Sequence, residues 1–223
     1  MPRPHEDLQH HTLTDHSPGG PPIALALGSW WAIEVGHVAA DRADAAIASY
    51  ETLIEKARSS STKGGDGLIL CSHNHRRVIA LLRLEGHDGF RRLASAWDEH
   101  HLVAQRHAIA ESRSLLLYRL SRAEGDATID PASSEALAFE QVRIGAETVA
   151  DLAGAFAGAP GFRGAFVFGP DDDGYTSIVY HFAHLPEIEA FRATAHAERI
   201  LGPAAKAADS FYSVHAMKTF GGS

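Results

Sequence analysis

Trp30-Trp31-Ala32-Ile33-Glu34-Val35-Gly36 and Phe139-Glu140-Gln141-Val142-Arg143-Ile144-Gly145 open two series of elements that follow the same order along the chain. The two stretches start 109 residues apart, and Gly89-Phe90-Arg91 is echoed by Ala190-Phe191-Arg192 after 101 residues. A repeat of this length is typical of a duplicated domain rather than of a solenoid. Because a small open sheet buries only one face by itself, two copies predict two sheets packed against each other.

Hydrophobic periodicity predicts the same order of elements in both halves. In the first half we expect strands over 23–35, 68–72, 78–84 and 114–120, with helices after Asp41 and Asp88. In the second half we expect strands over 138–144, 164–168, 176–182 and 210–217, with helices around Val149–Phe156 and from Pro186 to about Leu201. Each half is therefore β-α-β-β-α-β in type, which is a ferredoxin-like unit.

The expected fold class is α+β, with two fused ferredoxin-like units that form one pseudo-dimeric barrel within the chain. We place a disordered N-terminal arm at 1–22, the first unit at 23–122, a polar linker at 123–135 and the second unit at 136–223. A barrel that closes within one chain is compatible with a monomer and with a homodimer.

Composition excludes several classes of function. The 223 residues carry a formal charge of −8, which argues against nucleic acid as a partner because phosphate contacts need clustered Lys and Arg. Cys71 is the single cysteine, so no intrachain disulfide is expected. No apolar run approaches the roughly 20 residues of a membrane span, and the N-terminus lacks the apolar segment of a signal peptide. We therefore expect a cytoplasmic protein without a membrane partner.

Two short motifs resemble a known family. Ala159-Pro160-Gly161-Phe162-Arg163-Gly164 lies between a helix and a strand, and Trp97-Asp98-Glu99-His100-His101 lies on a helix. Both are similar to segments of the antibiotic biosynthesis monooxygenases, within the dimeric α+β barrel superfamily, and the resemblance covers roughly residues 23–220. It departs from the family at Ser61-Thr62-Lys63-Gly64-Gly65, which replaces the Pro-Gly-Phe junction in the first unit, and the matching helix of the second unit has no Trp.

The resemblance implies an oxygenase of secondary metabolism that acts on an aromatic polyketide-like substrate, through proton abstraction followed by reaction with O₂. It implies no tightly bound cofactor. A reduced flavin supplied in trans by a flavin reductase remains an alternative, and so does a haem-binding barrel with His101, His181 or His215 as the axial ligand. A non-oxidative cyclase or binding barrel is the third alternative. Purified protein should be colourless unless haem is bound.

His101 is the leading candidate for a catalytic base. At 100° per residue it falls in the middle of the apolar face of its helix, between Trp97 and Ala104. A half-buried imidazole has a movable pKa and suits general acid–base catalysis. The alternative is a core histidine that is hydrogen-bonded to a backbone carbonyl.

Aromatic and polar strand residues complete the candidate site. Trp97 and Trp31 could form a slot for a planar ring, with Tyr118 or Arg143 as the partner of a phenolate, although aromatic residues usually build core. Candidate substrate-binding residues also lie on the later strands, where periodicity does not identify the face inside the barrel: His181, His215, Tyr180 and Tyr212.

We expect one working site, in the first unit, without a contribution from His196. The i, i+2 pair His73 and His75 is better explained as a solvated hairpin tip than as metal ligands, so no metal site is expected.

Overall fold

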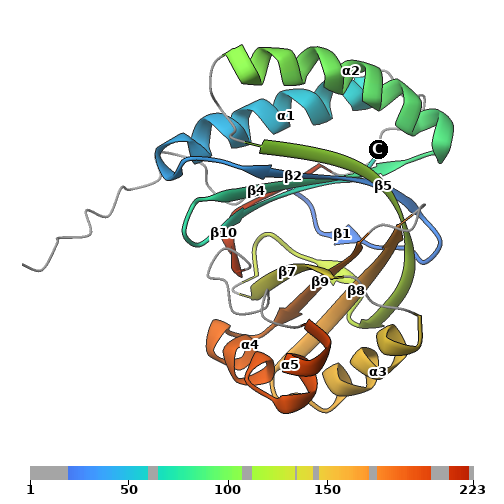
Figure 1. Ribbon diagram of the computed structural model, residues 1–223, viewed down its shortest axis with the longest axis vertical. Helices are drawn as coiled ribbons and strands as arrows, with labels where there is room; N and C mark the ends of the chain where they lie inside the picture. The colour runs from blue at the N-terminus through green and yellow to red at the C-terminus, as the bar shows by residue number, and fades with distance from the viewer. Residues whose placement is uncertain are drawn as a thin grey trace, which may run out of the picture.

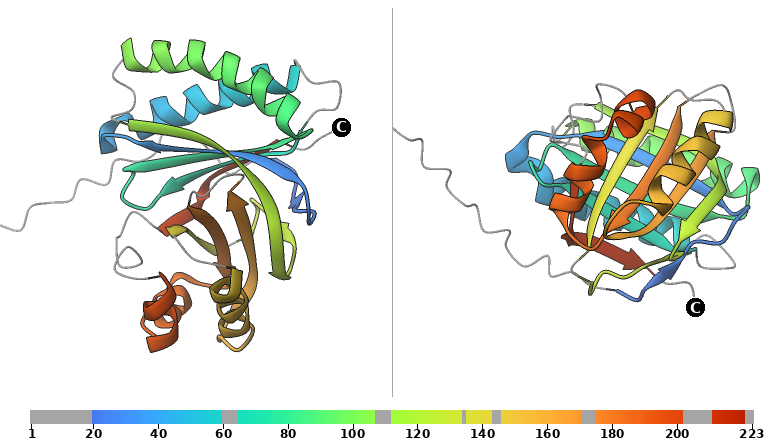
Figure 2. Two further views of the ribbon diagram at one scale, coloured as in Figure 1. Left: turned by 45° about the vertical axis from the view of Figure 1, so that its right-hand side comes forward. Right: turned by 90° about the horizontal axis from the view of Figure 1, so that it is seen from below.

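The computed structural model describes residues 20–59, 65–106, 112–133, 135–142, 146–170, 175–201 and 211–220. Antiparallel strands form a closed barrel in the order β10-β3-β4-β2-β5-β8-β9-β7 (Figures 1 and 2). The strands are β2 (Trp30–His37), β3 (Gly67–Ser72), β4 (Arg77–Leu84), β5 (Ser112–Gly125), β7 (Ala136–Val142), β8 (Phe162–Pro170), β9 (Thr176–Phe182) and β10 (Phe211–Phe220).

The barrel consists of two units with the same strand order. The first unit has the order β3-β4-β2-β5 and the second has β8-β9-β7-β10. The units join at two seams, where β5 pairs with β8 and β10 pairs with β3. This arrangement confirms the expected fold of two fused ferredoxin-like units in one pseudo-dimeric barrel.

Helices cover the outside of the barrel on two opposite sides (Figure 1). In the first unit, a short 3₁₀ turn (Ala40–Arg42) leads into α1 (Ala43–Ser59), which packs beside α2 (His87–Arg106). In the second unit the helices are α3 (Ala146–Ala157), α4 (Leu185–Arg192) and α5 (Ala195–Leu201). The burial of α1 follows helical spacing, because its buried residues recur every three or four positions: Ala43, Ala46, Ile47, Tyr50, Leu53 and Ile54.

Alternation along β2 and β7 separates the barrel interior from the helix-covered face. Ile33 and Phe139 belong to the interior cluster, whereas Val142 belongs to the cluster beneath the helices of the second unit. A repeat spacing of 109 residues would make Ile33 equivalent to Val142, although these two residues lie on opposite faces of the barrel wall. The spacing is therefore wrong, because a shift by an odd number of residues exchanges the two faces of a strand. Ala32-Ile33-Glu34 instead matches Ala138-Phe139-Glu140, which lies 106 residues later.

The expected strand over 23–35 is interrupted at Gly28, whose φ of 79° breaks the alternation, and Leu27 beside it is 63% exposed. The first part forms β1 (Ile23–Ala24), which pairs with β6 (Thr128–Ile129) inside the stretch expected as a linker. The side chains of Ile23, Leu25 and Ile129 belong to the interior cluster. Because the barrel is closed around its side, these side chains reach its interior from one end. We call β1, Leu25 and β6 the plug.

Candidate functional site

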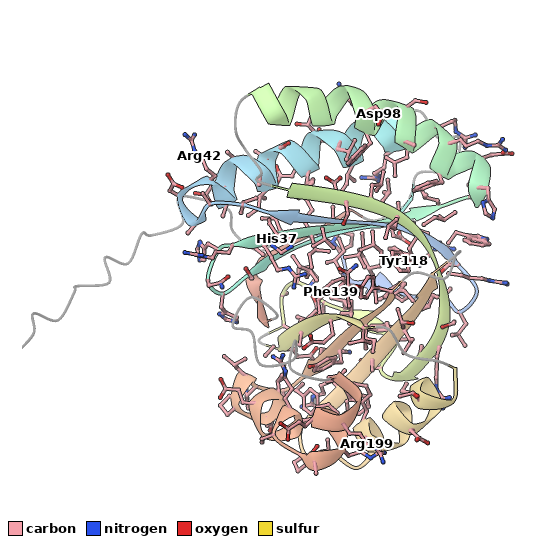
Figure 3. All side chains as sticks on the ribbon, viewed as in Figure 1. His37, Arg42, Asp98, Tyr118, Phe139 and Arg199 are labelled. Atoms are coloured by element: carbon pink, nitrogen blue, oxygen red, sulfur yellow. The ribbon has the colours of Figure 1, made fainter. Side chains whose placement is uncertain are left out.

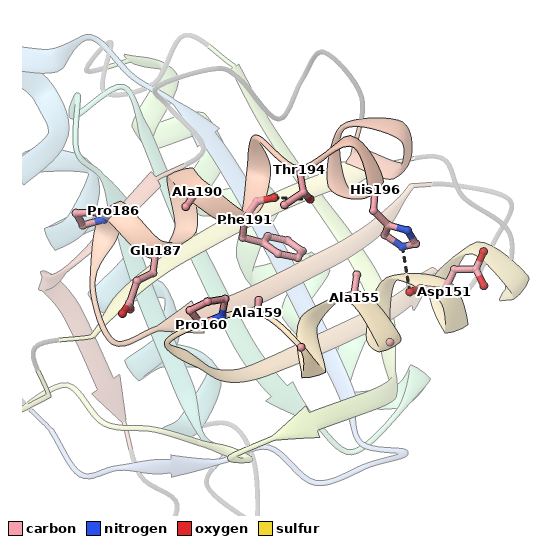
Figure 4. Close-up of a pocket in the computed structure, with 12 residues that line it drawn as sticks. Asp151, Ala155, Ala159, Pro160, Pro186, Glu187, Ala190, Phe191, Thr194 and His196 are labelled. Carbon is pink, nitrogen blue, oxygen red and sulfur yellow. Dashed lines mark hydrogen bonds between the residues drawn. The ribbon is translucent and has the colours of Figure 1, made fainter.

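A groove runs between α3 and α4–α5 on the outside of the second unit (Figure 4). Its volume is about 680 Å³, within the range of roughly 300–1,000 Å³ that is typical of small-molecule sites. We call it the α3/α4 groove. It is lined by Asp151, Gly154, Ala155, Gly158, Ala159, Pro160, Pro186, Glu187, Ala190, Phe191, Thr194 and His196.

The groove owes its width to small residues on α3 and to a break in the opposite helix. A Cβ on Gly154 or Gly158 would meet no atom within 4 Å, so these positions leave open space. The single helix expected from Pro186 to Leu201 ends at Arg192, with Ala193 as its C-cap. Thr194 Oγ1 then accepts the backbone N–H of Ala197 at 3.2 Å and starts α5. After this break α5 packs against α3, and the groove lies above the point where the ring of Phe191 from α4 meets α3.

Aromatic rings form the floor of the groove. The ring of Phe191 stacks on that of Phe156, with ring centroids 4.7 Å apart. Its centroid lies 6.0 Å from the centroid of the Tyr180 ring, in an edge-on arrangement. Tyr180 is fully buried beneath the helices rather than inside the barrel. The sequence left open which face of this strand lies inside the barrel, and the alternation of β9 turns Tyr180 to the outer, helix-covered face.

A buried charged network lies below this floor. Arg192 Nη2 is 2.8 Å from Glu140 Oε1, and the Tyr180 hydroxyl donates to the same carboxylate at 3.3 Å. Glu140 and Arg192 are both almost completely buried. Burial and the negative charge of Glu140 raise the pKa of Tyr180 well above its usual value, so the phenol keeps its proton. The network joins α4, which carries Phe191, to strand β7.

His196 supplies an imidazole at one end of the groove. Its Nε2 lies 3.2 Å from the carbonyl oxygen of Asp151 (Figure 4). Arg199 Nη2 lies 3.4 Å from Nδ1 of the same ring. Since a guanidinium only donates, Nδ1 is the acceptor and the Nε2–H donates to Asp151. At the other end, Glu187 Oε2 accepts the backbone N–H of His184 in the capping box of α4.

The barrel interior is packed rather than hollow around its candidate residues. Trp31 and Tyr118 are register partners on β2 and β5, and both are fully buried in the interior cluster. Figure 3 shows Tyr118 and Phe139 inside the barrel. Gln141 Nε2 donates to Tyr118 Oη at 3.3 Å and to Ser177 Oγ at 3.4 Å. The two predicted residues are thus brought together, but as core.

The expected slot between Trp97 and Trp31 is not formed. Trp97 packs on the cluster between the helices and the sheet of the first unit, whereas Trp31 lies on the opposite face of that sheet. A helix side chain cannot reach across a sheet to the interior residues, so the predicted slot of Trp97 with Trp31 is wrong, whereas Trp31 and Tyr118 do lie together. The described groove lies in the second unit and includes His196, contrary to the sequence-based expectation.

Of the remaining candidate residues, His181 faces the barrel interior, and the others are described only by their backbone or not at all. The ring of His181 stacks there on Phe166. Tyr212 pairs in register with Leu137 and Ser72, and His215 lies where β10 shifts register against β3. Arg143 and residues 1–19 of the expected N-terminal arm lie outside the described residues. The backbone of three further candidates is described but their side chains are not: His101, Tyr212 and His215.

Within the described part of the chain, no three His, Cys, Asp or Glu side chains come together as metal ligands. Among the helices described, none is long and apolar enough to cross a membrane.

Sequence reasoning missed Gly154, Gly158, Phe191 and Thr194. The available signals were Gly154 in an apolar helix with Gly158 just after that helix, and a Thr in the middle of an expected helix, since Thr favours N-caps over helix interiors.

Comparison with known proteins places the chain by its fold. No family model matches the chain, and no curated protein matches its sequence. An anthrone oxidase-like protein superposes with a TM-score of 0.65 at 14% identity, over 89% of this chain and 96% of that one. A protein of Fusobacterium nucleatum subsp. nucleatum, provisionally named a monooxygenase, has a TM-score of 0.54 at 10% identity, over 89% and 98%. A ferredoxin-fold protein of Listeria monocytogenes, related to antibiotic biosynthesis monooxygenases, has a TM-score of 0.44 at 11% identity, over 78% and 82%.

Identities this low establish the fold alone. The first two similarities confirm that the chain has the dimeric α+β barrel fold that the sequence motifs indicated, here with both halves of the barrel in one chain.

Proposed function

We propose that the protein is an oxygenase that binds a flat, neutral aromatic substrate in the α3/α4 groove, with His196 as the base. One observation carries this proposal: the groove offers about 680 Å³ of apolar space over an aromatic floor, with an imidazole at one end. An apolar pocket with a few polar groups suits a planar ring system whose orientation must be fixed. The names of the two structural relatives, one anthrone oxidase-like, support the choice of reaction.

The chemistry needs a proton acceptor and exclusion of water. An activated CH₂ of the substrate gives a proton to Nδ1 of His196, which releases its contact with Arg199. The resulting carbanion passes one electron to O₂, and the substrate radical and superoxide combine to a peroxide. The peroxide takes the proton back from the imidazolium and loses water to leave a ketone. One O₂ is thus consumed for each CH₂ oxidised to C=O, and one water is formed.

The lining of the groove does not fit flavin mononucleotide or haem. Flavin phosphate and haem propionates require cationic partners, and the lining residues include the carboxylates of Asp151 and Glu187 but no Lys or Arg. A neutral substrate is compatible with both carboxylates, which can accept hydrogen bonds from ring hydroxyls.

Oxygen uptake with anthrone as the substrate tests the proposal. Wild-type protein should consume one O₂ per anthrone, and His196→Ala should lower the rate roughly 100-fold without a change in the free energy of unfolding. His87→Ala, on the exposed start of α2, is the matched control and should keep the wild-type rate. Conversion of substrate without O₂ uptake would favour the cyclase alternative. A Soret band that appears with haem and depends on His196 would favour the haem protein.

The position of the site has its own test. Gly154→Leu should fill the groove and abolish anthrone binding, whereas Gly154→Ala should keep it, because a methyl group there meets no atom within 4 Å. Equal binding by wild type and Gly154→Leu would place the site elsewhere.

A further inference from the structure

His181 lies at the plugged end of the barrel and is independent of the proposed oxygenase site. It is 1% exposed on β9, and its Nδ1 lies 2.6 Å from Glu135 Oε2, just before β7. Its ring stacks on Phe166 at 5.9 Å, with an angle of 13° between the ring planes. The imidazole is thus held flat against the core with one nitrogen on a carboxylate.

The second nitrogen faces another acceptor. Among the described residues, Nε2 of His181 has no hydrogen-bond partner although it is buried. A Cβ on Gly164 would collide with both this Nε2 and the carbonyl oxygen of Asp126, so the two atoms border the same spot. A neutral imidazole has one N–H and can serve one of these two acceptors, whereas the imidazolium has two and can serve both.

The two acceptors flank strand β6 of the plug. Asp126 Oδ1 accepts the N–H of Thr128 at 2.9 Å, and the carbonyl of Ala127 accepts the N–H of Leu25 at 2.9 Å. Glu135 lies on the other side of β6, directly before β7. His181 is therefore bonded to the chain after β6 through Glu135, and its Nε2 lies beside Gly164 together with the carbonyl of Asp126 before β6.

We propose that His181 is a proton-operated clasp that holds the plug in the end of the barrel. The imidazolium binds Glu135 and the Asp126 carbonyl together and keeps β1 and β6 seated. Loss of the proton leaves one nitrogen lone pair against an acceptor, so the plug opens more often when the imidazole is neutral than when it is charged.

The surroundings of the imidazole support this assignment. Two of its described neighbours are apolar, namely Phe166 of β8 and Leu137, the register partner of His181 on β7. The charged groups nearest along the adjoining segments have partners of their own or lie at the surface: the Asp126 carboxylate with Thr128, the Arg122–Glu124 pair at 2.7 Å, and exposed Arg163.

Hydrogen exchange of the full-length protein between pH 5.5 and 8.5 tests the clasp. After correction for intrinsic exchange, protection of the Leu25 and Thr128 amides should fall about tenfold across this range, which corresponds to the loss of one hydrogen bond to a charged group. Amides of Ile47 and Tyr50 in α1 are the internal control and should not change. In His181→Asn the plug amides should show no such dependence on pH. A wild-type plug with constant protection, or the same slope in His181→Asn, would overturn the proposal.

Ring-nitrogen NMR of the wild type keeps the clasp testable if the variant does not fold. Both nitrogens of His181 should carry protons when the plug amides are protected, and one should lose its proton as protection falls. A neutral ring at pH 5.5 with a fully protected plug would contradict the clasp.

Discussion

In the first unit α1 and α2 lie against each other over the sheet, whereas in the second unit the α3/α4 groove separates α3 from α4. The sheets beneath have the same strand order, and each directs a buried carboxylate outward, Glu34 in β2 and Glu140 in β7. The difference lies in the helices. α2 is one helix of 20 residues, while its counterpart breaks at Ala193 and Thr194 into α4 and α5. The same strand order thus supports one closed helix layer and one helix layer that leaves a groove.

Thiol labelling should show the largest contrast between the halves. Cys71 lies beneath α1 and α2, where burial raises the pKa of its thiol from 9.0 to about 12. The reactive thiolate is then roughly 1,000 times scarcer at pH 8 than for an ordinary cysteine. We expect no labelling of native protein, but rapid labelling of a cysteine introduced by Ala155→Cys in the groove, measured in the Cys71→Ala background. Equal labelling rates would remove the distinction between a closed and an open helix layer.

The raised pKa of Cys71 also has a consequence for stability. Because the folded state holds the thiol proton more tightly than the unfolded state, its contribution is complete below pH 9 and is lost as the pH rises toward 12. Cys71→Ala should flatten this part of the alkaline stability curve.

The buried ion pair should give the next largest effect. Arg192→Ala leaves the Glu140 carboxylate buried without its guanidinium and should cost about 3–5 kcal/mol of unfolding free energy. Arg91, which follows Phe90 as Arg192 follows Phe191, is 78% exposed in its pair with Asp88. Arg91→Ala should change stability by less than about 0.5 kcal/mol. Urea denaturation of both variants measures the contrast, and similar losses would show that the two helices are held alike.

The helix break should respond more modestly. Thr194→Ala removes the side-chain oxygen that accepts the N–H of Ala197 and should cost about 1 kcal/mol. Thr194→Ser keeps that oxygen and should retain most of the stability. A variant Thr194→Ala as stable as wild type would mean that the break does not depend on this cap.

The smallest effect is a gain. Gly154→Ala in α3 should raise the unfolding free energy by about 0.5–1 kcal/mol, since alanine loses less backbone freedom in a helix and its methyl group points into open space. Thermal unfolding of the variant measures this gain, and a loss of stability would show that the groove is narrower than described.

The fold could be predicted from sequence because alternation and helical spacing mark the faces of each element. Trp31 and Tyr118 are both expected on strands of the first unit, and the structure pairs them in register in one core. Alternation places Tyr180 and His181 on opposite faces of the sheet but does not state which face is covered by helices. It therefore could not show that Trp97 and Trp31 lie on opposite sides of the first sheet. The groove depends on the distance between α3 and α4, which is set by Thr194 and by tertiary packing rather than by local periodicity.

Strand β10 has a consequence for the synthesis of the chain. It pairs with β3 on one side and with β7 on the other, so it completes one seam between the units. β3 ends at Ser72 and β10 ends at Phe220, and a ribosome adding roughly 5–20 residues per second needs about 7–30 s between them. During this interval the edge of β3 can pair with another nascent chain. Chaperones that bind exposed strand edges should therefore act on the first unit while the second is still being translated.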